Sequence, residues 1–336
     1  MVEVVKKWMA ISHVCVLVRN NYTVEKFATL CRENEITCIA KLEGGFYRSE
    51  PVRDFSALLA ALLYPQDNRC LYNLLISPYT CVVPDVAVLE KMEGDTHLIN
   101  DYLNSLLERE NWHDYLAQLR YEPVFVIIEK ILQDHNPVEN YFSFCKNGFP
   151  LYGKHNNPEI DAQSYEMNLN KLLQILYENF TGEYVSLIEI YDFLQNKMNT
   201  NTDEDELYPE PADRKSYVEC MTVHKAKGDE FETVILPYTR KSFFRDELDD
   251  KNAVLITVNT TDPPRAAWAC KCKDALRCNE WYTEYLVEEN NAVRREEARL
   301  LYVALTRAKK NLLCFITDCP KRDTWDGLLQ IREEGR

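Results

Sequence analysis

Two segments in the last third of the chain combine polar and charged side chains with an adjoining apolar run. The first is Met221-Thr-Val-His-Lys-Ala-Lys-Gly-Asp-Glu-Phe231, and the second is Glu296-Glu-Ala-Arg-Leu-Leu-Tyr-Val-Ala-Leu-Thr-Arg-Ala-Lys-Lys310. A hydrophobic core has no need of hydroxyl, imidazole, ammonium and guanidinium groups at the edge of one element. These residues are therefore candidates for a functional site rather than for packing.

Arg19 is a third candidate, because it ends the apolar run His13–Arg19. At the carboxyl edge of a strand, an arginine can present a fixed fork of N–H donors to phosphate oxygens. A surface arginine that caps a strand would have the same sequence context. Taken alone, the residues around Arg19 favour capping, and only the two later segments favour phosphate binding.

The first elements that could position these residues alternate between strand and helix. Residues 13–19 predict a buried strand, residues 24–34 a helix and residues 36–40 a second strand. This β-α-β order predicts a parallel sheet with a right-handed crossover.

The middle of the chain is predicted to be mainly helical. Residues 55–63 are strongly apolar, and apolar residues recur at helical spacing in residues 169–180 and 187–194. The stretch 199–213 then holds six acidic residues, two prolines and no base, which predicts a solvated connector.

Strand patterns return after this acidic stretch. Residues 217–223, 233–236 and 254–258 predict strands, and residues 297–310 predict a helix that leads into a strand at 312–316. The sequence therefore predicts an α/β domain that is split by a helical insertion.

These features resemble a known family. The segments 221–231 and 296–310 resemble motifs V and VI of the UvrD/Rep/PcrA group of superfamily 1 DNA helicases, in the same order. Residues 16–20 resemble motif IV. Residues 44–54 are similar to the start of that family's insertion, with Pro51 where the family has a glutamate. The resemblance is close at both ends of the chain and weak across its helical middle.

The resemblance implies that the chain is the C-terminal region (domains 2A and 2B) of such a helicase. The implied fold is a RecA-like parallel-sheet domain, related to P-loop NTPases, that a mainly helical domain interrupts. The expected division is 1–45 for the first part of domain 2A, 46–198 for domain 2B, 199–215 for the acidic linker and 216–336 for the second part of domain 2A.

The same resemblance implies roles for single residues. It implies that Arg19 and Arg307 sense the γ-phosphate. It also implies that ATP is contacted by Arg19, Gly228, Glu230 and Arg307, and the DNA backbone by Thr222 and His224. The motif departs from the family at Asp229, where a leucine is usual. As isolated residues, a turn glycine, a core histidine and a surface arginine would explain Gly228, His224 and Arg307 equally well.

The implied activity is ATP-dependent, 3′-to-5′ unwinding or translocation on single-stranded or double-stranded DNA, in repair or recombination. ATP and Mg²⁺ would be bound mainly by a first motor domain (1A), whose phosphate-cradling loop this sequence lacks, so the chain alone is expected to be inactive. Two alternatives stay open. One is a catalytically inactive DNA- or protein-binding module, and the other is a fragment of a RecB/AddA-type helicase–nuclease.

Two other motifs are rejected as sites. Gly148-Phe-Pro-Leu-Tyr-Gly-Lys-His155 has the spacing of a phosphate-binding loop, but His155 replaces the serine or threonine that would bind Mg²⁺. Cys270, Cys272 and Cys278 could suggest zinc, but a structural site needs four ligands, so reduced thiols in a linker are expected and no metal site is predicted.

Composition bounds these hypotheses. The 336 residues have a net charge of −15, which excludes a protein that coats nucleic acid nonspecifically and requires any DNA contact to be a narrow basic track. No apolar run is long enough to cross a bilayer, and the first residues do not resemble a signal peptide. Twelve cysteines without such a signal favour reduced thiols and a cytoplasmic location.

Overall fold

The computed structural model describes residues 1–181, 185–200, 204–211, 213–243, 253–258, 265–272, 275–321 and 323–330. For residues 109, 253–258, 265, 271–272 and 275–276 it describes the backbone alone. The chain divides into two compact units, the first made of Met1–Phe27 with Lys215–Arg336 and the second of Ala28–Arg214. The expected strand at residues 254–258 thus falls within the described backbone.

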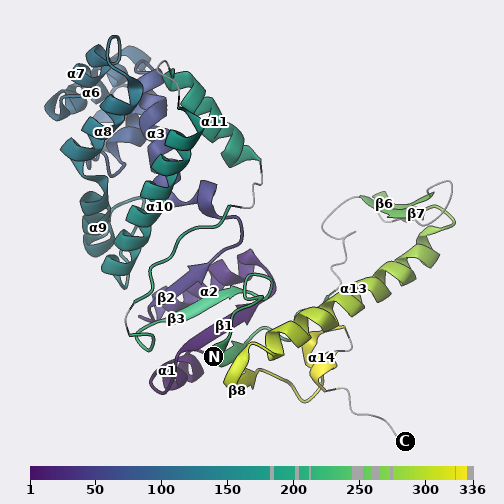
Figure 1. Cartoon of the computed structure of the whole chain (residues 1–336). Coiled ribbons are helices and arrows are strands. Elements are labelled where there is room, and N and C mark those ends of the chain that lie inside the picture. The colour runs from purple at the N-terminus through teal and green to yellow at the C-terminus, as the bar shows by residue number, and fades with distance from the viewer. Residues whose placement is uncertain are drawn as a thin grey trace, which may run out of the picture. The chain divides into compact units, whose positions relative to one another are not determined.

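The first unit contains a parallel sheet in which neighbouring strands lie in the order β3-β1-β4-β8 (Figure 1). These strands are β1 (Val14–Val18), β3 (Val218–Thr222), β4 (Phe231–Leu236) and β8 (Ala308–Cys314). Every residue of β1 and β3 is buried, as expected for strands that are covered on both faces. The predicted α/β class with a parallel sheet is confirmed.

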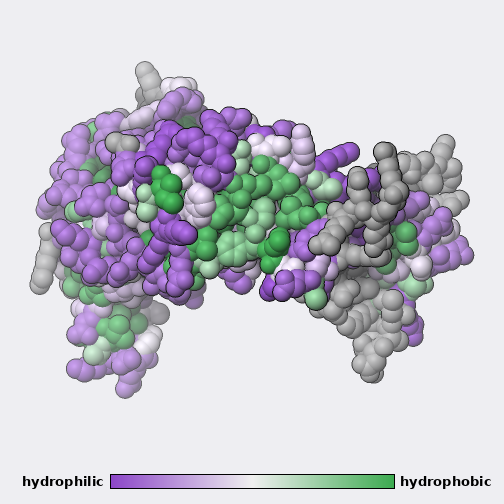
Figure 2. Space-filling model, turned by 90° about the horizontal axis from the view of Figure 1, so that it is seen from below, coloured by the Kyte–Doolittle hydropathy of each residue, from purple (hydrophilic) through white to green (hydrophobic). Residues whose placement is uncertain are grey.

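Among the residues that the structure describes, four helices accompany this sheet: α1 (Val2–Met9), α2 (Asn21–Glu33), α13 (Tyr282–Leu305) and α14 (Trp325–Leu329). Helix α2 begins three residues earlier than predicted and runs on into the second unit. The edge strand β8 is only partly covered: Leu312 is 41% exposed. Figure 2 shows one face of the molecule on which hydrophobic residues form a continuous area.

Helix α13 differs most from its prediction. It starts 15 residues before the expected residue 297 and ends at Leu305, so the prediction that Arg307 lies on a helix is wrong. The Arg307 N–H group bonds to the Ala304 carbonyl at 3.3 Å, and the Arg307 carbonyl accepts from the Phe231 N–H at 2.9 Å. The helix therefore ends because the chain pairs with β4 and continues as β8, the next strand of the sheet.

A second, antiparallel sheet contains β5 (Ala253–Val258), β6 (Arg265–Cys272) and β7 (Ala275–Cys278). The predicted strand near residue 254 is confirmed, but it belongs to this sheet and not to the parallel one. The prediction that the nearby cysteines lie in a linker is wrong, because Cys270 and Cys278 lie on β6 and β7, and neither is in a disulfide. The Cys272 side chain lies outside the described part.

The second unit is mainly helical and also contains the short strand β2 (Cys38–Lys41). Its helices are α3 (Glu50–Leu63), α4 (Asn68–Leu75), α5 (Val86–Lys91), α6 (Thr96–Leu107), α7 (Trp112–Gln118), α8 (Val124–His135), α9 (Pro137–Asn147), α10 (Pro158–Asn179) and α11 (Leu187–Asn199), with 3₁₀ turns at Phe46–Arg48 and Glu108–Glu110. Their buried residues form one hydrophobic cluster. No helix in the described part of the chain is long and apolar enough to cross a membrane.

The rejected phosphate-loop motif lies between two helices of this unit. Gly148 follows α9 directly, so a helix stands where a phosphate-binding loop has a strand, and α10 begins only at Pro158. The His155 imidazole pairs with the Asp161 carboxylate, and 2.8 Å separates Nδ1 from the carboxylate oxygen. The rejection of this motif is thus confirmed by its structural context.

The acidic stretch is bonded to the second unit over residues 204–211. The Phe46 N–H donates to the Glu204 carbonyl at 3.1 Å. The buried amide of Asn168 pairs with both backbone groups of Leu207, donating to its carbonyl and accepting from its N–H at 2.8 Å each. Asn168 thus gives this part of the acidic stretch a backbone partner that composition does not reveal, while Asp205, Leu207 and Glu210 remain exposed.

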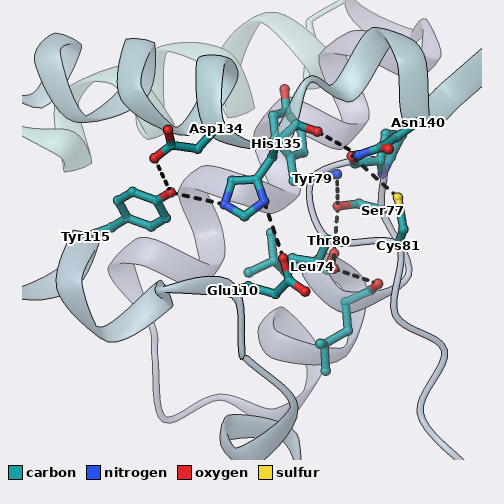
Figure 3. A network of polar contacts seen from close by, with 12 residues as sticks. Leu74, Ser77, Tyr79, Thr80, Cys81, Glu110, Tyr115, Asp134, His135 and Asn140 are labelled. Atoms are coloured by element: carbon teal, nitrogen blue, oxygen red, sulfur yellow. Dashed lines mark hydrogen bonds and ion pairs between the residues drawn. The ribbon is translucent and has the colours of Figure 1, made fainter. Parts of the chain in front are cut away.

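Polar contacts also tie the short helices of this unit together (Figure 3). The Tyr115 hydroxyl donates to Asp134 at 2.7 Å and lies 3.2 Å from His135 Nε2. On its other side, His135 Nδ1 lies 3.6 Å from the Glu110 carboxylate. Burial lowers the pKa of His135, and burial raises the pKa of the nearby Cys81 thiol to about 12. The raised pKa keeps the Cys81 thiol protonated near neutral pH, which disfavours a nucleophilic role for it.

A buried carboxyl joins α3 to α10 and to the loop that precedes α10. Asp54 of α3 accepts hydrogen bonds from the Tyr152 hydroxyl at 2.7 Å and from the Tyr165 hydroxyl at 3.0 Å. Burial raises the pKa of Asp54 from 3.8 to about 7, although the Tyr152 and Tyr165 hydrogen bonds act in the opposite direction. Asp54 belongs to the segment that resembles the start of the family's insertion. In the structure, its two hydrogen bonds anchor α3.

This raised pKa predicts a pH-dependent stability. The folded chain keeps a proton on Asp54 that the unfolded chain loses above pH 3.8, so the free energy of unfolding falls as pH rises from 3.8 to about 7. Asp54→Asn is neutral at every pH and should remove this loss, which is about 4 kcal/mol over the whole range and about 2 kcal/mol between pH 5.5 and pH 8. Urea unfolding at about pH 5.5 and about pH 8 measures this difference.

The exposed Asp101 of α6 provides the matched control. Asp101→Asn makes the same substitution at an exposed carboxyl instead of a buried one, so its pH dependence should equal that of the unchanged chain. An Asp54→Asn variant with the same pH dependence as Asp101→Asn would contradict the buried-carboxyl explanation.

Candidate functional site

The carboxyl edge of the parallel sheet holds three of the predicted site residues. Val18 of β1 lies opposite Thr222 of β3, and the Val223 N–H donates to the Val18 carbonyl at 2.9 Å. Arg19 and His224 therefore leave neighbouring strands at the same edge. Parallel strands share their carboxyl edge, which is where ligands of α/β folds commonly bind.

Arg19 is held firmly at this edge. Its guanidinium forms an ion pair with Glu297 of α13 and donates to the Ser242 carbonyl at 3.2 Å. The second Glu297 oxygen accepts from the Trp325 indole N–H at 2.8 Å. The Arg19 and Glu297 side chains are only 20% and 9% exposed, so Arg19 is no loosely placed surface residue.

Thr222 and His224 differ in their access to solvent. Thr222 is 2% exposed, and its hydroxyl oxygen accepts from the Lys225 N–H at 3.2 Å. His224 is exposed, so the interpretation of a core histidine is wrong. As the structure stands, His224 can offer a hydrogen bond to a ligand, whereas Thr222 shapes the turn that presents it.

Residues 223–230 connect the end of β3 to the start of β4. Parallel strands usually need a dozen or more residues for such a crossover, so this connection is short. Backbone hydrogen bonds from Lys227 to His224 and from Asp229 to Ala226, at 3.1 and 3.2 Å, fold it into successive turns. Gly228 adopts a φ of +103°, which only glycine takes without strain, so the expectation of a turn glycine holds structurally.

Arg307 lies at the opposite, amino edge of the sheet, where β8 begins. Its Nη1 donates to the Asp229 carbonyl at 3.1 Å, its Nε to the Val303 carbonyl at 3.0 Å and its Nη2 to the Thr306 hydroxyl at 3.0 Å. These partners are uncharged oxygens, so they orient the guanidinium without neutralising it. The segments 221–231 and 296–310 thus meet through Arg307 and Asp229.

Glu230 also lies at the amino edge. Its carboxylate forms an ion pair with Lys309 of β8 at 3.3 Å, and both side chains are more than half exposed. An exposed pair of this kind contributes little to stability and opens at little cost. Glu230 therefore remains available to accept a hydrogen bond from a ligand hydroxyl group.

The structure separates the six predicted residues into two groups. Gly228, Glu230 and Arg307 lie together at the amino edge, and the other three (Arg19, Thr222 and His224) lie at the carboxyl edge. Glu297, the partner of Arg19, precedes the end of α13 by eight residues, which is about 12 Å along the helix. Arg19 and Arg307 are thus not brought together.

Two further residues complete the carboxyl edge: Glu297, which belongs to the segment 296–310, and Trp325, which the sequence did not single out. Glu297 and Trp325 position Arg19, and the sequence held one signal for the first of them. Glu297 lies four residues before Leu301 and is buried with it on α13, where a charged residue requires a partner. Among the residues that the structure describes, no three histidine, cysteine, aspartate or glutamate side chains form a group that could hold a metal ion.

Comparison with known proteins gives one family and a consistent set of relatives. The family model of the UvrD-like helicase C-terminal domain matches residues 1–318. Relatives that are named as subunits of an ATP-dependent helicase/nuclease occur in Clostridium novyi, 24% identical over 317 residues, and in Oceanobacillus iheyensis, 23% identical over 312 residues. A third, in Staphylococcus saprophyticus, is 29% identical over 211 residues.

The coverage of these alignments is unequal. They cover 85%, 89% and 62% of this chain, but only 23%, 24% and 15% of the respective relatives. The chain therefore spans at most about a quarter of the length of these relatives.

The Arg19–Glu297 pair should show strong coupling. Glu297→Ala leaves a mostly buried guanidinium without its counter-ion and should lower the free energy of unfolding by about 3 kcal/mol. Arg19→Ala with Glu297→Ala should cost less than the sum of the two single changes, with a coupling energy of about 1–3 kcal/mol. Urea unfolding of the four proteins gives this coupling energy.

The exposed Arg294–Asp323 pair, at 2.6 Å with side chains 44% and 36% exposed, is the control. Its coupling energy should stay below about 1 kcal/mol because solvent screens it. If the Arg19–Glu297 coupling is no larger than this, the buried pair does not position Arg19.

Proposed function

Because the chain belongs to the UvrD-like helicase C-terminal domain family, we propose that it is the C-terminal motor region of an ATP-dependent DNA helicase or translocase. In this proposal, residues 1–45 and 216–336 form domain 2A, residues 46–198 form the helical insertion 2B, and residues 199–215 join them. A first motor domain of the same protein (1A) is the partner that completes the ATP site.

The observation that carries this proposal is the junction of Arg307 with the 223–230 connection. Arg307 keeps its charge and is oriented by the carbonyl of Asp229, the residue beside Glu230. An arginine so held can stabilise the charge that develops as a terminal phosphoryl group leaves. We assign Arg307 to the γ-phosphate, Glu230 to the ribose, and Gly228 to close approach of the backbone to the nucleotide.

ATP and Mg²⁺ themselves would be held mainly by domain 1A. Phosphate and magnesium binding require a glycine-rich loop with an adjacent hydroxyl and a carboxylate, and this chain contributes neither. What this chain supplies is the arginine side of the site, which responds to the presence of the terminal phosphate.

The carboxyl edge is assigned to DNA. His224 offers a hydrogen bond to a backbone phosphate, and Thr222 supports it by shaping the turn, so both would position the strand without reading its sequence. The resemblance assigns Arg19 to the γ-phosphate. Its place beside His224 favours a DNA phosphate instead, because the Arg307 group lies at the other edge.

The two edges would be coupled through the short connection between them. Binding of ATP between domains 1A and 2A would draw Arg307 and the residues bonded to it toward the nucleotide, and hydrolysis would release them. Because His224 and Glu230 belong to one eight-residue connection, a shift at the amino edge moves the DNA contact as well. Repeated closing and opening would step the motor along single-stranded DNA, in the 3′-to-5′ direction that the family resemblance implies.

The names of the relatives favour one alternative within this proposal. Each of the three matched relatives is named as part of an ATP-dependent helicase/nuclease, so the motor region can belong to a helicase–nuclease that acts in DNA repair or recombination. The gene decides between the candidates. A preceding in-frame Gly-x4-Gly-Lys-Thr segment supports a motor, a following nuclease domain supports the helicase–nuclease, and a stop codon before Met1 supports a catalytically inactive binding module.

The isolated chain should hydrolyse no ATP above background, with or without single-stranded DNA. The reason is that it lacks the phosphate-cradling loop and the magnesium ligands. A coupled phosphate-release assay measures this. ATP turnover that disappears in a Lys154→Ala variant would contradict the proposal, because it would make the rejected loop at residues 148–155 a genuine site.

In the longer protein that includes domain 1A, Arg307→Ala should lower DNA-stimulated ATP turnover by about 10³-fold, the usual contribution of a phosphate-sensing arginine. ATP affinity should change far less, because the other domain holds most of the nucleotide. Steady-state kinetics give kcat and KM separately. Arg299→Ala is the control, since Arg299 lies on α13 and is 77% exposed. Equal turnover in the two variants would remove Arg307 from the ATP site.

A further inference from the structure

An exposed aromatic ring lies beside two lysines in the first unit. Tyr22, in the first turn of α2, is 56% exposed. The Lys26 Nζ atom lies 4.6 Å from the centroid of its ring, and the Lys241 Nζ atom lies 6.0 Å from the same centroid. Two cations from distant parts of the sequence therefore converge on one solvent-exposed ring.

The ring adjoins the carboxyl edge of the sheet. Tyr22 follows Arg19 by three residues, and Lys241 precedes Ser242, whose carbonyl accepts from the Arg19 guanidinium at 3.2 Å. Lys241 and Arg19 also line one small pocket with Thr23. The ring thus lies next to the residues that were assigned to the DNA backbone.

The electrostatic environment of the ring is positive. The Lys26 ammonium, through its hydrogen bond and its charge, lowers the pKa of the Tyr22 hydroxyl, and the charge of Lys241 adds to this effect. In a chain with a net charge of −15, such a local cationic surface is where a polyanion can approach.

A tyrosine and a lysine four residues apart on a helix often pair on an exposed surface, and this would explain Lys26 alone. It does not explain Lys241, which comes from the segment after β4. An exposed ring that is flanked by cations has the chemistry of a stacking platform, on which an unpaired base lies while the lysines contact the adjoining phosphates. Bases of a duplex are already stacked, so the matching ligand is a single strand.

We infer that Tyr22, together with Lys26 and Lys241, forms a base-stacking platform for single-stranded DNA at the carboxyl edge of the sheet. This inference rests on the proposed function, because it adds a base contact to the backbone contacts of His224 and Arg19. The platform reads no sequence, since every base has a face that can stack.

Fluorescence anisotropy of a labelled oligothymidylate of about 15 nucleotides, titrated with the chain, tests the platform. Tyr22→Ala should weaken binding roughly 10-fold, the loss expected when one base loses its aromatic partner. Tyr22→Phe keeps the ring and should bind as the unchanged chain does. Lys241→Ala should reduce the slope of affinity against salt by about 0.7, the value for one lost phosphate contact of a single strand.

An abasic oligonucleotide of the same length separates stacking from misfolding. It has no bases to stack, so Tyr22→Ala and the unchanged chain should bind it equally. Tyr121→Ala is the control on the second unit, because Tyr121 is 72% exposed and lies in no such cationic cluster among the described contacts. It should leave both affinities unchanged.

Three results would overturn the platform. Tyr22→Ala could bind oligothymidylate as tightly as the unchanged chain, or it could lose affinity equally for the abasic strand. In either case, weakened binding by His224→Ala would leave the proposed DNA contact standing and remove the platform alone. A chain that binds neither oligonucleotide would overturn the platform and the DNA assignment of the carboxyl edge together, while the Arg307 assignment would be judged by ATP turnover.

Discussion

The common direction of β1, β3, β4 and β8 is the constraint on which the candidate site depends. Parallel strands begin at one edge of a sheet and end at the other, so their flanking residues sort into two groups. In most parallel folds a helix connects successive strands, but here residues 223–230 make the crossing in a few turns. Few rotatable bonds then separate His224 from Glu230. A displacement at one end of so short a connection is therefore transmitted to its other end.

The two arginines differ in whether a neighbouring group balances the charge of the guanidinium. Arg19 lies against Glu297, and the second Glu297 oxygen is held by Trp325, so its charge is balanced before any ligand arrives. A phosphate at Arg19 would share the guanidinium with Glu297, which suits a contact that must form and release at each step. Arg307 is oriented by carbonyl and hydroxyl oxygens and keeps its full charge. Preorganised, uncompensated charge is what stabilises a developing anion most effectively.

The sequence was informative where burial sets the pattern and silent where distant residues meet. Strand β1 is wholly apolar and β3 and β4 are mostly buried, and their approximate positions followed from the apolar runs in the sequence. The start of α13 did not, because residues 282–296 carry many charges and little apolar stripe. The position of Arg307 was missed for a different reason. No residue next to Leu305 in the sequence ends α13. The helix ends because the Phe231 N–H, more than seventy residues earlier, donates to the Arg307 carbonyl and so pairs the chain with β4. Asn168 and Leu207 are a second such pair.

In both units, buried acidic residues have hydrogen-bond or ion-pair partners. These partners matter for how a chain of net negative charge could contact DNA. Asp54 receives two tyrosine hydroxyls, and Glu297 receives a guanidinium and an indole N–H, so these buried carboxyls carry partners and add little to the outer field. The remaining negative charge is on the surface, where salt screens it beyond about 8–10 Å. Near the carboxyl edge, Lys26 and Lys241 add positive charge, whereas the charge of Arg19 is balanced by Glu297. Acidic surface beyond this edge repels nucleic acid that cannot reach it. A strongly negative total charge is therefore compatible with the DNA contact proposed for this edge.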